Sequence, residues 1–462
     1  MSAVLWSRDA AVAATGGHCS VDWNANGVSI DTRTLQAGDL FVALQDQRDG
    51  HDFVAQALEN GAAAAMVSRV PEGVSSDAPL LIVDDVLRGL ETLAVAARAR
   101  TGAKVVAVTG SVGKTGTKEM LRSVLAPQGR VHAAEKSYNN HWGVPLTLAR
   151  MPVGTDFAVI EIGMNHAGEV APLSRLARPD VAIVTNVAAV HMAAFDSVEA
   201  IAFEKASVIE GLSGGVAVLN ADMETSAVLA KVAGKTDALW FGETASDFRL
   251  TGVEVGADTA RVSAQVLGGN IEFTIGATGR HLAMNALAVL AAVHAIGADV
   301  KIAAEALADW RPPAGRGERW VIGGVNLIDD SYNANPLSMA AALNVLAHGT
   351  GRRVAFLGDM LELGPNEVAL HCAISDSVSL GKVDKIHCVG PLMKHLFEAL
   401  PAEKRGVWVE SSADLAAQVN ELLTDGDVVM VKGSLGAKMG LIVDAIKNLG
   451  DARPLTETGG TI

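Results

Sequence analysis

Lys114 and Thr115 stand in a glycine-containing loop between a predicted strand and a predicted helix. The apolar run Val105–Val108 predicts a buried parallel strand, and Lys118–Leu125 predicts the helix. Glycines allow backbone N–H groups to converge on phosphate oxygens, and a helix N-terminus adds partial positive charge. A lysine at this point can contact the β- and γ-phosphates of a nucleotide, and a threonine hydroxyl can bind Mg²⁺.

The loop differs from the standard P-loop in its spacing. Only two residues separate Gly110 from Gly113, whereas the standard pattern has four residues between the first glycine and the Gly-Lys pair. The alternative is an ordinary turn that happens to contain Gly-Lys-Thr. We expect the following residues to hold the nucleotide: Gly110, Ser111, Val112, Gly113, Lys114, Thr115 and Gly116.

Three further side chains are candidates for metal or proton chemistry. Glu161 follows the apolar run Phe157–Ile160, and a carboxylate there suits a second ligand for the Mg²⁺ of a nucleotide. The alternative is a capping or surface glutamate. His191 follows another predicted strand, where a structural histidine is the alternative. Lys205 lies on a predicted helix that Ser197 can cap, and its alternative is a solvated helix lysine.

Composition limits the classes of protein to which the chain can belong. Its 462 residues suggest about three domains, and 49% apolar with 19% charged residues indicate a folded protein. A net charge of -15 disfavours nucleic acid as a partner. Met1–Trp6 has no basic region leading into an apolar run, so we expect no signal peptide, and no apolar run predicts a transmembrane segment. Three scattered cysteines make neither a metal pattern nor a disulfide framework, which fits the cytoplasm.

The pattern of strands and helices predicts an α/β protein of three domains. Residues 1–98 predict a small α/β domain, and residues 99–313 a central domain of the P-loop type with a mostly parallel sheet. Within it, residues 245–276 alternate like a small inserted antiparallel meander. Trp310–Gly317 is rich in proline and glycine and marks a boundary. Residues 314–462 predict a doubly wound domain like a dinucleotide fold.

The expected elements are given by residue range. For the first domain they are strands at 28–33, 40–44, 62–67 and 80–83 and helices at 53–60 and 87–101. For the third domain they are strands at 325–328, 353–357, 385–389, 407–409 and 428–431 and helices at 336–348, 366–380, 391–399 and 412–423. In open α/β sheets ligands bind at the carboxyl ends of strands, so we expect Glu161 and Thr185–Asn186 near the phosphate loop.

Taken together, several segments resemble the Mur ligase family, which adds amino acids to peptidoglycan precursors with ATP. The segments are Thr109–Thr115, Tyr138–Pro145, Glu161–Asn165, Asn186–Val187 with His191, and Glu204–Ala206. Three segments of the third domain are similar to the branch of the family that attaches D-alanyl-D-alanine: Asp329–Met339, Leu357–Gly364 and Val431–Ser434.

The resemblance implies catalytic and metal-binding roles. Lys114 contacts the phosphates, and Thr115 and Glu161 bind one Mg²⁺. Glu161, His191 and Lys205 bind a second Mg²⁺. In the family, the lysine at the position of Lys205 is usually carbamylated, which turns a cation into a carboxylate-like ligand. That chemistry needs a neutral lysine, which desolvation can supply.

The resemblance also implies contacts to ATP and to the other substrates. Asn285 corresponds to an adenine contact, and Arg316 and Asp330 correspond to ATP contacts at the domain junction. The first domain corresponds to a UDP-binding domain, with Thr32, Arg33 and Asp49 as candidates. The remaining substrate candidates are Asn140, Asn186, Tyr332, Asn333 and Asn335.

The implied activity is an ATP-dependent ligase that adds D-alanyl-D-alanine to UDP-N-acetylmuramoyl-tripeptide through an acyl phosphate. We expect a monomeric enzyme in the cytoplasm. Two alternatives stay open. The chain can be another ligase of the family with a different amino donor, such as L-lysine or diaminopimelate. It can also be a nucleotide-binding scaffold without ligase turnover, although a scaffold has no need of the whole metal set.

Overall fold

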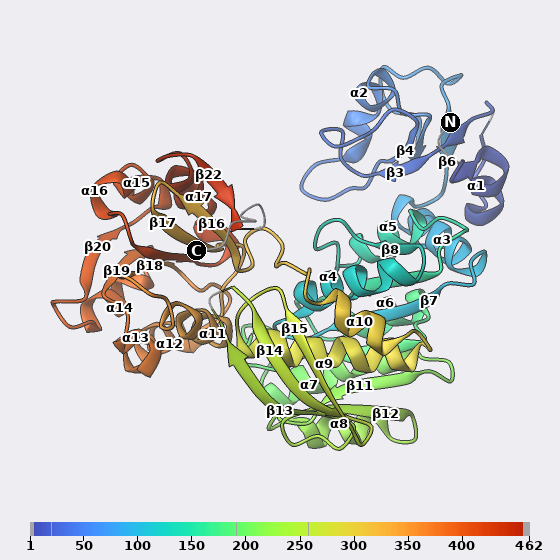
Figure 1. The fold of residues 1–462 in the computed structure, drawn as a ribbon. Helices are drawn as coiled ribbons and strands as arrows, with labels where there is room; N and C mark the ends of the chain where they lie inside the picture. The colour runs from blue at the N-terminus through green and yellow to red at the C-terminus, as the bar shows by residue number, and fades with distance from the viewer. Residues whose placement is uncertain (1–3, 20, 191, 257, 456–462) are drawn as a thin grey trace.

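A computed structural model describes residues 4–19, 21–190, 192–256 and 258–455, over which the chain forms three units (Figure 1). Figure 1 shows the first unit and the C-terminal unit on different sides of the central unit. Each unit is built around a sheet that is parallel over much of its width. The α/β architecture expected from the sequence is therefore confirmed.

The first unit has a parallel sheet in the order β3-β4-β5-β6. These strands are β3 (Gly27–Ser29), β4 (Asp39–Val42), β5 (Ala64–Val67) and β6 (Leu80–Ile82). The other elements of the unit are β1 (Trp6–Ser7), α1 (Arg8–Thr15), β2 (Asn24–Ala25), η1 (Gly50–Phe53), α2 (Val54–Glu59) and α3 (Val86–Ala99). The strand expected at 28–33 is shorter because the carbonyl of Asp31 accepts bonds from the N–H groups of Thr34 and Leu35, which makes a turn.

The central unit has a sheet in the order β15-β14-β13-β12-β11-β10-β7-β9-β8. Its strands are β7 (Lys104–Thr109), β8 (Val131–Ala133), β9 (Phe157–Glu161), β10 (Val181–Val184), β11 (Val216–Asn220), β12 (Asp237–Gly242), β13 (Phe248–Val255), β14 (Ala260–Val266) and β15 (Gly269–Ile275). The antiparallel meander expected at 245–276 is present as β13–β15. It is an extension of the central sheet and not a separate insertion, because β13 pairs with β12.

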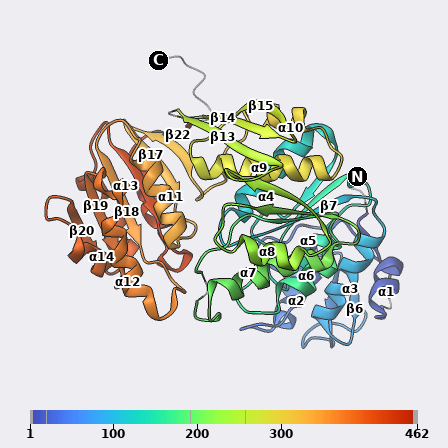
Figure 2. The ribbon, with the colours of Figure 1, turned by 90° about the horizontal axis from the view of Figure 1, so that it is seen from below.

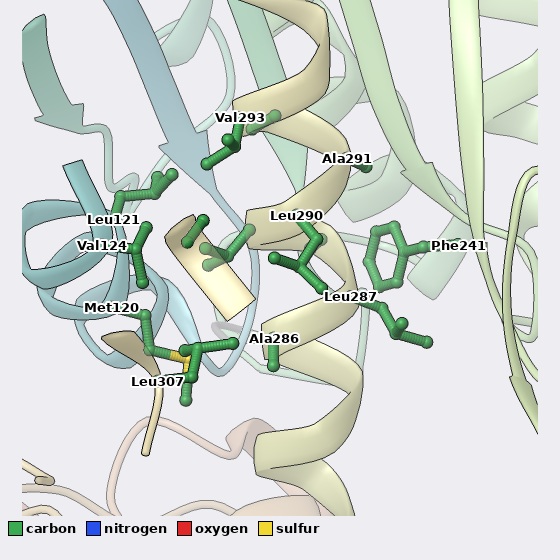
Figure 3. Close-up of a cluster of buried hydrophobic side chains, with 14 of the residues drawn as sticks. Met120, Leu121, Val124, Phe241, Ala286, Leu287, Leu290, Ala291, Val293 and Leu307 are labelled. Atoms are coloured by element: carbon green, nitrogen blue, oxygen red, sulfur yellow. The ribbon is translucent and has the colours of Figure 1, made fainter. Parts of the chain in front are cut away.

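Helices cover both faces of the central sheet. One face packs against α4 (Lys114–Leu125), α9 (Arg280–Ala295) and α10 (Val300–Ala306), and the other against α5 (Gly143–Ala149), α6 (Val170–Ala177), α7 (Val198–Ala206) and α8 (Ser226–Ala233). The short helices η2 (Ala126–Gln128) and η3 (Ser207–Gly211) follow α4 and α7. Figure 3 shows Leu121 and Val124 of α4 opposite Leu287 and Leu290 of α9 in the first of these cores. This packing fixes α4, and with it the loop at its N-terminus.

The C-terminal unit has a sheet in the order β20-β19-β18-β21-β17-β16-β22. Its strands are β16 (Glu318–Ile322), β17 (Val325–Asp330), β18 (Arg353–Gly358), β19 (Lys385–Val389), β20 (Arg405–Val409), β21 (Val428–Lys432) and β22 (Ala452–Pro454). β17 to β21 are parallel, and β16 and β22 add an antiparallel edge that the sequence did not indicate. Within the described ranges, no helix has both the length and the apolar character needed to cross a membrane.

The helices of the C-terminal unit also cover both faces of the sheet. One face carries α11 (Pro336–Leu346), η4 (Gly364–Asn366), α12 (Glu367–Cys372), η5 (Ala373–Asp376), α13 (Val378–Gly381) and α14 (Met393–Ala399). The other carries α15 (Ser412–Ala416), α16 (Val419–Leu422), η6 (Leu435–Ala437) and α17 (Gly440–Lys447). In Figure 2, α11 lies on the side of this unit that faces the central unit.

Candidate functional site

The glycine loop lies between β7 and α4, as the sequence predicts, but α4 begins at Lys114 and not at Lys118. The helix starts earlier because Gly113 precedes it with a φ of 89°, a left-handed conformation that favours glycine. Gly110 approaches the neighbouring strand end so closely that an added Cβ would lie 2.0 Å from Thr185 Oγ1. Both glycines are therefore required by the backbone path of the loop.

Residues after β10 support the loop from one side. The N–H of Ser111 donates to the carbonyl of Asn186 at 2.8 Å, and the Ser111 hydroxyl accepts from the N–H of Ala188 at 2.9 Å. Thr185 Oγ1 donates to the carbonyl of Val112 at 2.6 Å. These bonds hold the loop at the carboxyl ends of β7 and β10, where polar residues were expected to gather.

The Lys114 side chain folds back over the loop. Its Nζ donates to the carbonyl of Gly110 at 2.6 Å. Burial lowers the pKa of Lys114, and the negative charge of Glu161 opposes that shift. The ammonium therefore lies against the backbone of the glycine loop, at the wall of the cleft described below.

Glu161 ends β9 and is buried, with 1% of its surface exposed. Thr115 Oγ1 donates to its carboxylate at 3.0 Å, and Asn139 Nδ2 donates to Glu161 Oε1 at 2.7 Å. The alternative of a surface glutamate is therefore wrong. Asn139 was not among the residues singled out by sequence; the only signal for it was its place in the segment Tyr138–Pro145.

Lys205 lies on α7, whose N-terminus is capped by Ser197 as expected. Its side chain is buried, so the alternative of a solvated helix lysine is wrong. Burial lowers the pKa of Lys205 well below its ordinary value, and the nearby Lys114 charge lowers it further. No hydrogen bond or ion pair of the ammonium is seen within the part of the chain that the structure describes. His191, the other expected ligand, lies outside the described residues.

A cleft of about 1030 Å³ lies between the central and C-terminal units. The phosphate loop, Glu161 and Asn285 line it from the central unit, and Arg316 and Asp330 line it from the other side. Asn285 is close to the loop, since a Cβ on Gly113 would lie 2.9 Å from its Oδ1. The expected ATP contacts of both units therefore face one space.

A chain of hydrogen bonds joins the two units across this cleft. Arg316 Nη2 donates to Ser137 Oγ at 3.2 Å, and Ser137 Oγ lies 3.2 Å from Thr115 Oγ1, which in turn bonds to Glu161. The Arg316 guanidinium also lies over the Tyr332 ring, 4.0 Å from its centre. Ser137 was not singled out by sequence, since its role arises only from the contact between units.

The expected substrate residues divide into two groups. Asn140, Asn186, Tyr332, Asn333 and Asn335 line the cleft. Asn140 and Asn335 also stabilise helix starts. The Asn140 side chain accepts a hydrogen bond from the N–H of Gly143 at the start of α5, and the Asn335 side chain accepts one from the N–H of Ser338 at the start of α11.

Thr32, Arg33 and Asp49 lie in the first unit and do not line the cleft. Arg33 pairs with Asp31 at 2.6 Å, and the Asp49 carboxylate accepts from Arg69 and from the His51 ring. The Arg69 guanidinium lowers the pKa of Asp49. The contacts of Arg33 with Asp31 and of His51 with Asp49 lie within turns, whereas Arg69 reaches Asp49 from the segment after β5.

Comparison with known proteins places this geometry in a family. Three models match the chain: "Mur ligase family, catalytic domain" over residues 24–98, "Mur ligase middle domain" over 108–293, and "Mur ligase, glutamate ligase domain" over 315–435. The UDP-N-acetylmuramoyl-tripeptide--D-alanyl-D-alanine ligase of Escherichia coli is 36% identical over 93% of this chain and 95% of that protein. The chain belongs to the Mur ligase family.

A second relative and two solved structures of Mur ligases also match the chain over nearly its full length. The ligase of the same name from Rickettsia prowazekii is 31% identical over 96% of this chain and 99% of its own length. A crystal structure of MurF from Acinetobacter baumannii has a TM-score of 0.86 at 28% identity and covers 96% of this chain and 99% of its own. MurF from Thermotoga maritima in complex with ADP has a TM-score of 0.78 at 26% identity and covers 91% of this chain and 97% of its own.

Proposed function

We propose that this Mur ligase forms the amide bond between UDP-N-acetylmuramoyl-tripeptide and D-alanyl-D-alanine at the expense of ATP. Relatives that carry this name match the chain over almost its full length. The observation that supports the proposal most strongly is the cleft. It brings Lys114, Thr115 and Glu161 of one unit opposite Arg316 and Asp330 of another.

The chemistry is a transfer in two steps. The terminal carboxylate of the tripeptide attacks the γ-phosphorus of ATP, so that ADP leaves and an acyl phosphate forms. The amine of D-alanyl-D-alanine then attacks the carbonyl carbon, phosphate leaves with the bonding electrons, and the amine loses a proton. Lys114 and the backbone N–H groups of the loop offset the negative charge as two anions meet. Closure of the units around the cleft excludes water from the acyl phosphate, which would otherwise hydrolyse.

Thr115 and Glu161 fit a magnesium ion. A buried carboxylate and a hydroxyl 3.0 Å apart form a pair of hard oxygen donors beside the phosphate loop. When bound, Mg²⁺ neutralises phosphate charge. We propose these residues as the ligands of the first ion.

Lys205 fits a carbamate better than an ammonium. Burial lowers the pKa of Lys205, which favours the neutral amine over the ammonium, and only the neutral amine adds to CO₂. The product is an anion with oxygen donors. We propose that carbamylated Lys205 binds a second ion together with Glu161 and His191.

The three units divide the substrates among them in this proposal. Residues 1–98 bind the UDP part through Thr32, Arg33 and Asp49, residues 99–313 bind ATP, and residues 314–462 bind the amino substrate. The substrate residues of the cleft are Asn140, Asn186, Tyr332, Asn333 and Asn335. We propose a monomer, because the cleft is built from units of one chain.

A panel of amino donors tests the choice of substrate. Phosphate release in the presence of ATP and UDP-N-acetylmuramoyl-tripeptide is measured with D-alanyl-D-alanine, L-lysine and diaminopimelate in turn. We expect turnover with D-alanyl-D-alanine alone. Preference for either of the other amines would assign the chain to a different amino donor, and no turnover with any of them would favour the scaffold alternative.

A further inference from the structure

Lys432 is a buried lysine at the wall of the cleft that the reaction described above does not use. It ends β21, and its side chain is only 2% exposed. Its Nζ lies 2.8 Å from Asp330 Oδ2 and donates to the carbonyl of Asn333 at 2.9 Å. β17 and β21 are parallel neighbours in which Asp330 is the register partner of Lys432. The pair is therefore built by the ends of two adjacent strands.

A buried ion pair at this position contributes little to the stability of the fold, because burying its charges carries a desolvation penalty. Removing an ammonium from water carries a penalty that a carboxylate partner and further hydrogen bonds only offset. The Asp330 carboxylate is 22% exposed and faces the cleft, and among the described residues no hydrogen bond reaches its Oδ1. One oxygen of Asp330 is thus held by Lys432, while the other is available to a ligand in the cleft.

The second bond of Lys432 acts on the segment that follows Asp330. The Asn333 carbonyl belongs to the turn that carries Tyr332, over whose ring the Arg316 guanidinium lies. A single ammonium thereby connects the carboxylate and the turn to the rigid end of β21. Loss of the ammonium frees both at once.

From this geometry we infer that Lys432 is a positioning residue for the nucleotide: it holds the Asp330 carboxylate and the turn at Asn333 in the arrangement that binds ATP. The inference rests on the proposed assignment of Asp330 to the nucleotide. Lys432 acts through Asp330 and does not itself contact the reacting atoms.

The test is a comparison of nucleotide binding by the full chain with ADP and Mg²⁺ as the probe, measured by calorimetry. Lys432→Met should raise the Kd for ADP about tenfold or more, because the carboxylate loses the charged bond that fixes it. Lys404→Met is the matched control, since the Lys404 ammonium of the same unit donates to the carbonyls of Gly381 and Val383. This control should bind ADP as the parent protein does.

Kinetics separates positioning from a general structural effect. In Lys432→Met, the KM for ATP should rise by the same factor while kcat at saturating ATP changes by less than about twofold. A fall in kcat with an unchanged KM for ATP would overturn the inference.

A double-mutant cycle with Asp330→Asn decides whether Lys432 acts through Asp330. The double variant should lose less ADP affinity than the two single losses add up to, because part of the Lys432 effect passes through Asp330. It should fold even where Lys432→Met does not, because it leaves no unpaired buried charge. Additive losses would overturn the inference. If Lys432→Met binds ADP with unchanged affinity while Asp330→Asn binds it more weakly, the inference about Lys432 is wrong and the assignment of Asp330 stands. Unchanged affinity in Asp330→Asn would show that the assignment of Asp330 itself is wrong.

Discussion

Replacing Lys114 by alanine is expected to lower kcat by about 10²-fold or more while the fold is retained. The Lys114 ammonium lies within the phosphate loop, bonded to the carbonyl of Gly110, and has no part in the hydrophobic core. Its removal costs charge stabilisation at the transferring phosphate, which the backbone N–H groups of the loop only partly supply. Steady-state kinetics with saturating ATP, together with circular dichroism, measures both effects.

Lys104→Ala is the control for this variant. Lys104 lies at the start of the same strand, β7, is 54% exposed, and pairs with Asp180 at 3.2 Å. Its loss should change stability by no more than about 0.5 kcal/mol and leave the rate unchanged. A folded Lys114→Ala protein with a rate near that of Lys104→Ala would contradict the assignment of the loop to phosphate.

Replacing Lys205 by alanine is expected to abolish activity, and a short carboxylic acid should restore part of it. If Lys205 is carbamylated, its functional part is an anion, and acetate or formate can place an equivalent carboxylate in the vacated space. Because the Lys205 side chain is buried, its removal leaves a space enclosed by the protein. The measurement is the rate of phosphate release by the variant at increasing acetate and formate concentrations.

The Lys114→Ala variant is also the control here, because a carboxylate cannot replace an ammonium, and acetate should not restore its activity. Removal of CO₂ should lower the activity of the parent protein, and bicarbonate should restore it. An inactive Lys205→Ala protein that no carboxylate restores would mean that Lys205 does not act as a carbamate. A fully active one would mean that Lys205 has no role in the reaction.

Local patterns predicted those parts of the fold whose signals lie within a short segment. β19 spans Lys385–Val389, the bounds predicted from the sequence. The phosphate loop lies between β7 and α4, also as predicted. The early start of α4 was missed because the left-handed Gly113 allows the helix to begin within the loop. The edge strand β22 was missed because it pairs with β16, which lies more than a hundred residues away. β16 was also missed, although it forms a local hairpin with β17 across Gly323–Gly324.

Lys114 and Glu161 were predictable as residues that line the cleft, because their residue types at the ends of strands suggest chemistry by themselves. Ser137 and Lys432 were not, because each acts through a residue that is distant in sequence: Ser137 is 179 residues from Arg316, and Lys432 binds the end of a neighbouring strand. A serine in a loop carries no such signal, and the only signal for Lys432 was its place in the segment Val431–Ser434. The contact between Ser137 and Arg316 exists only after two units have come together, and the contact between Lys432 and Asp330 only after the sheet of the C-terminal unit has formed.

Transfer of oxygen from the acceptor to phosphate tests the central claim most directly. UDP-N-acetylmuramoyl-tripeptide with ¹⁸O in both oxygens of its terminal carboxylate is incubated with the enzyme, ATP and D-alanyl-D-alanine. The ¹⁸O content of the phosphate and of the amide product is then measured by mass spectrometry. An acyl phosphate requires that each ligation release one phosphate carrying one ¹⁸O, while the new amide keeps the other. Unlabelled phosphate, or AMP in place of ADP, would contradict the proposed reaction.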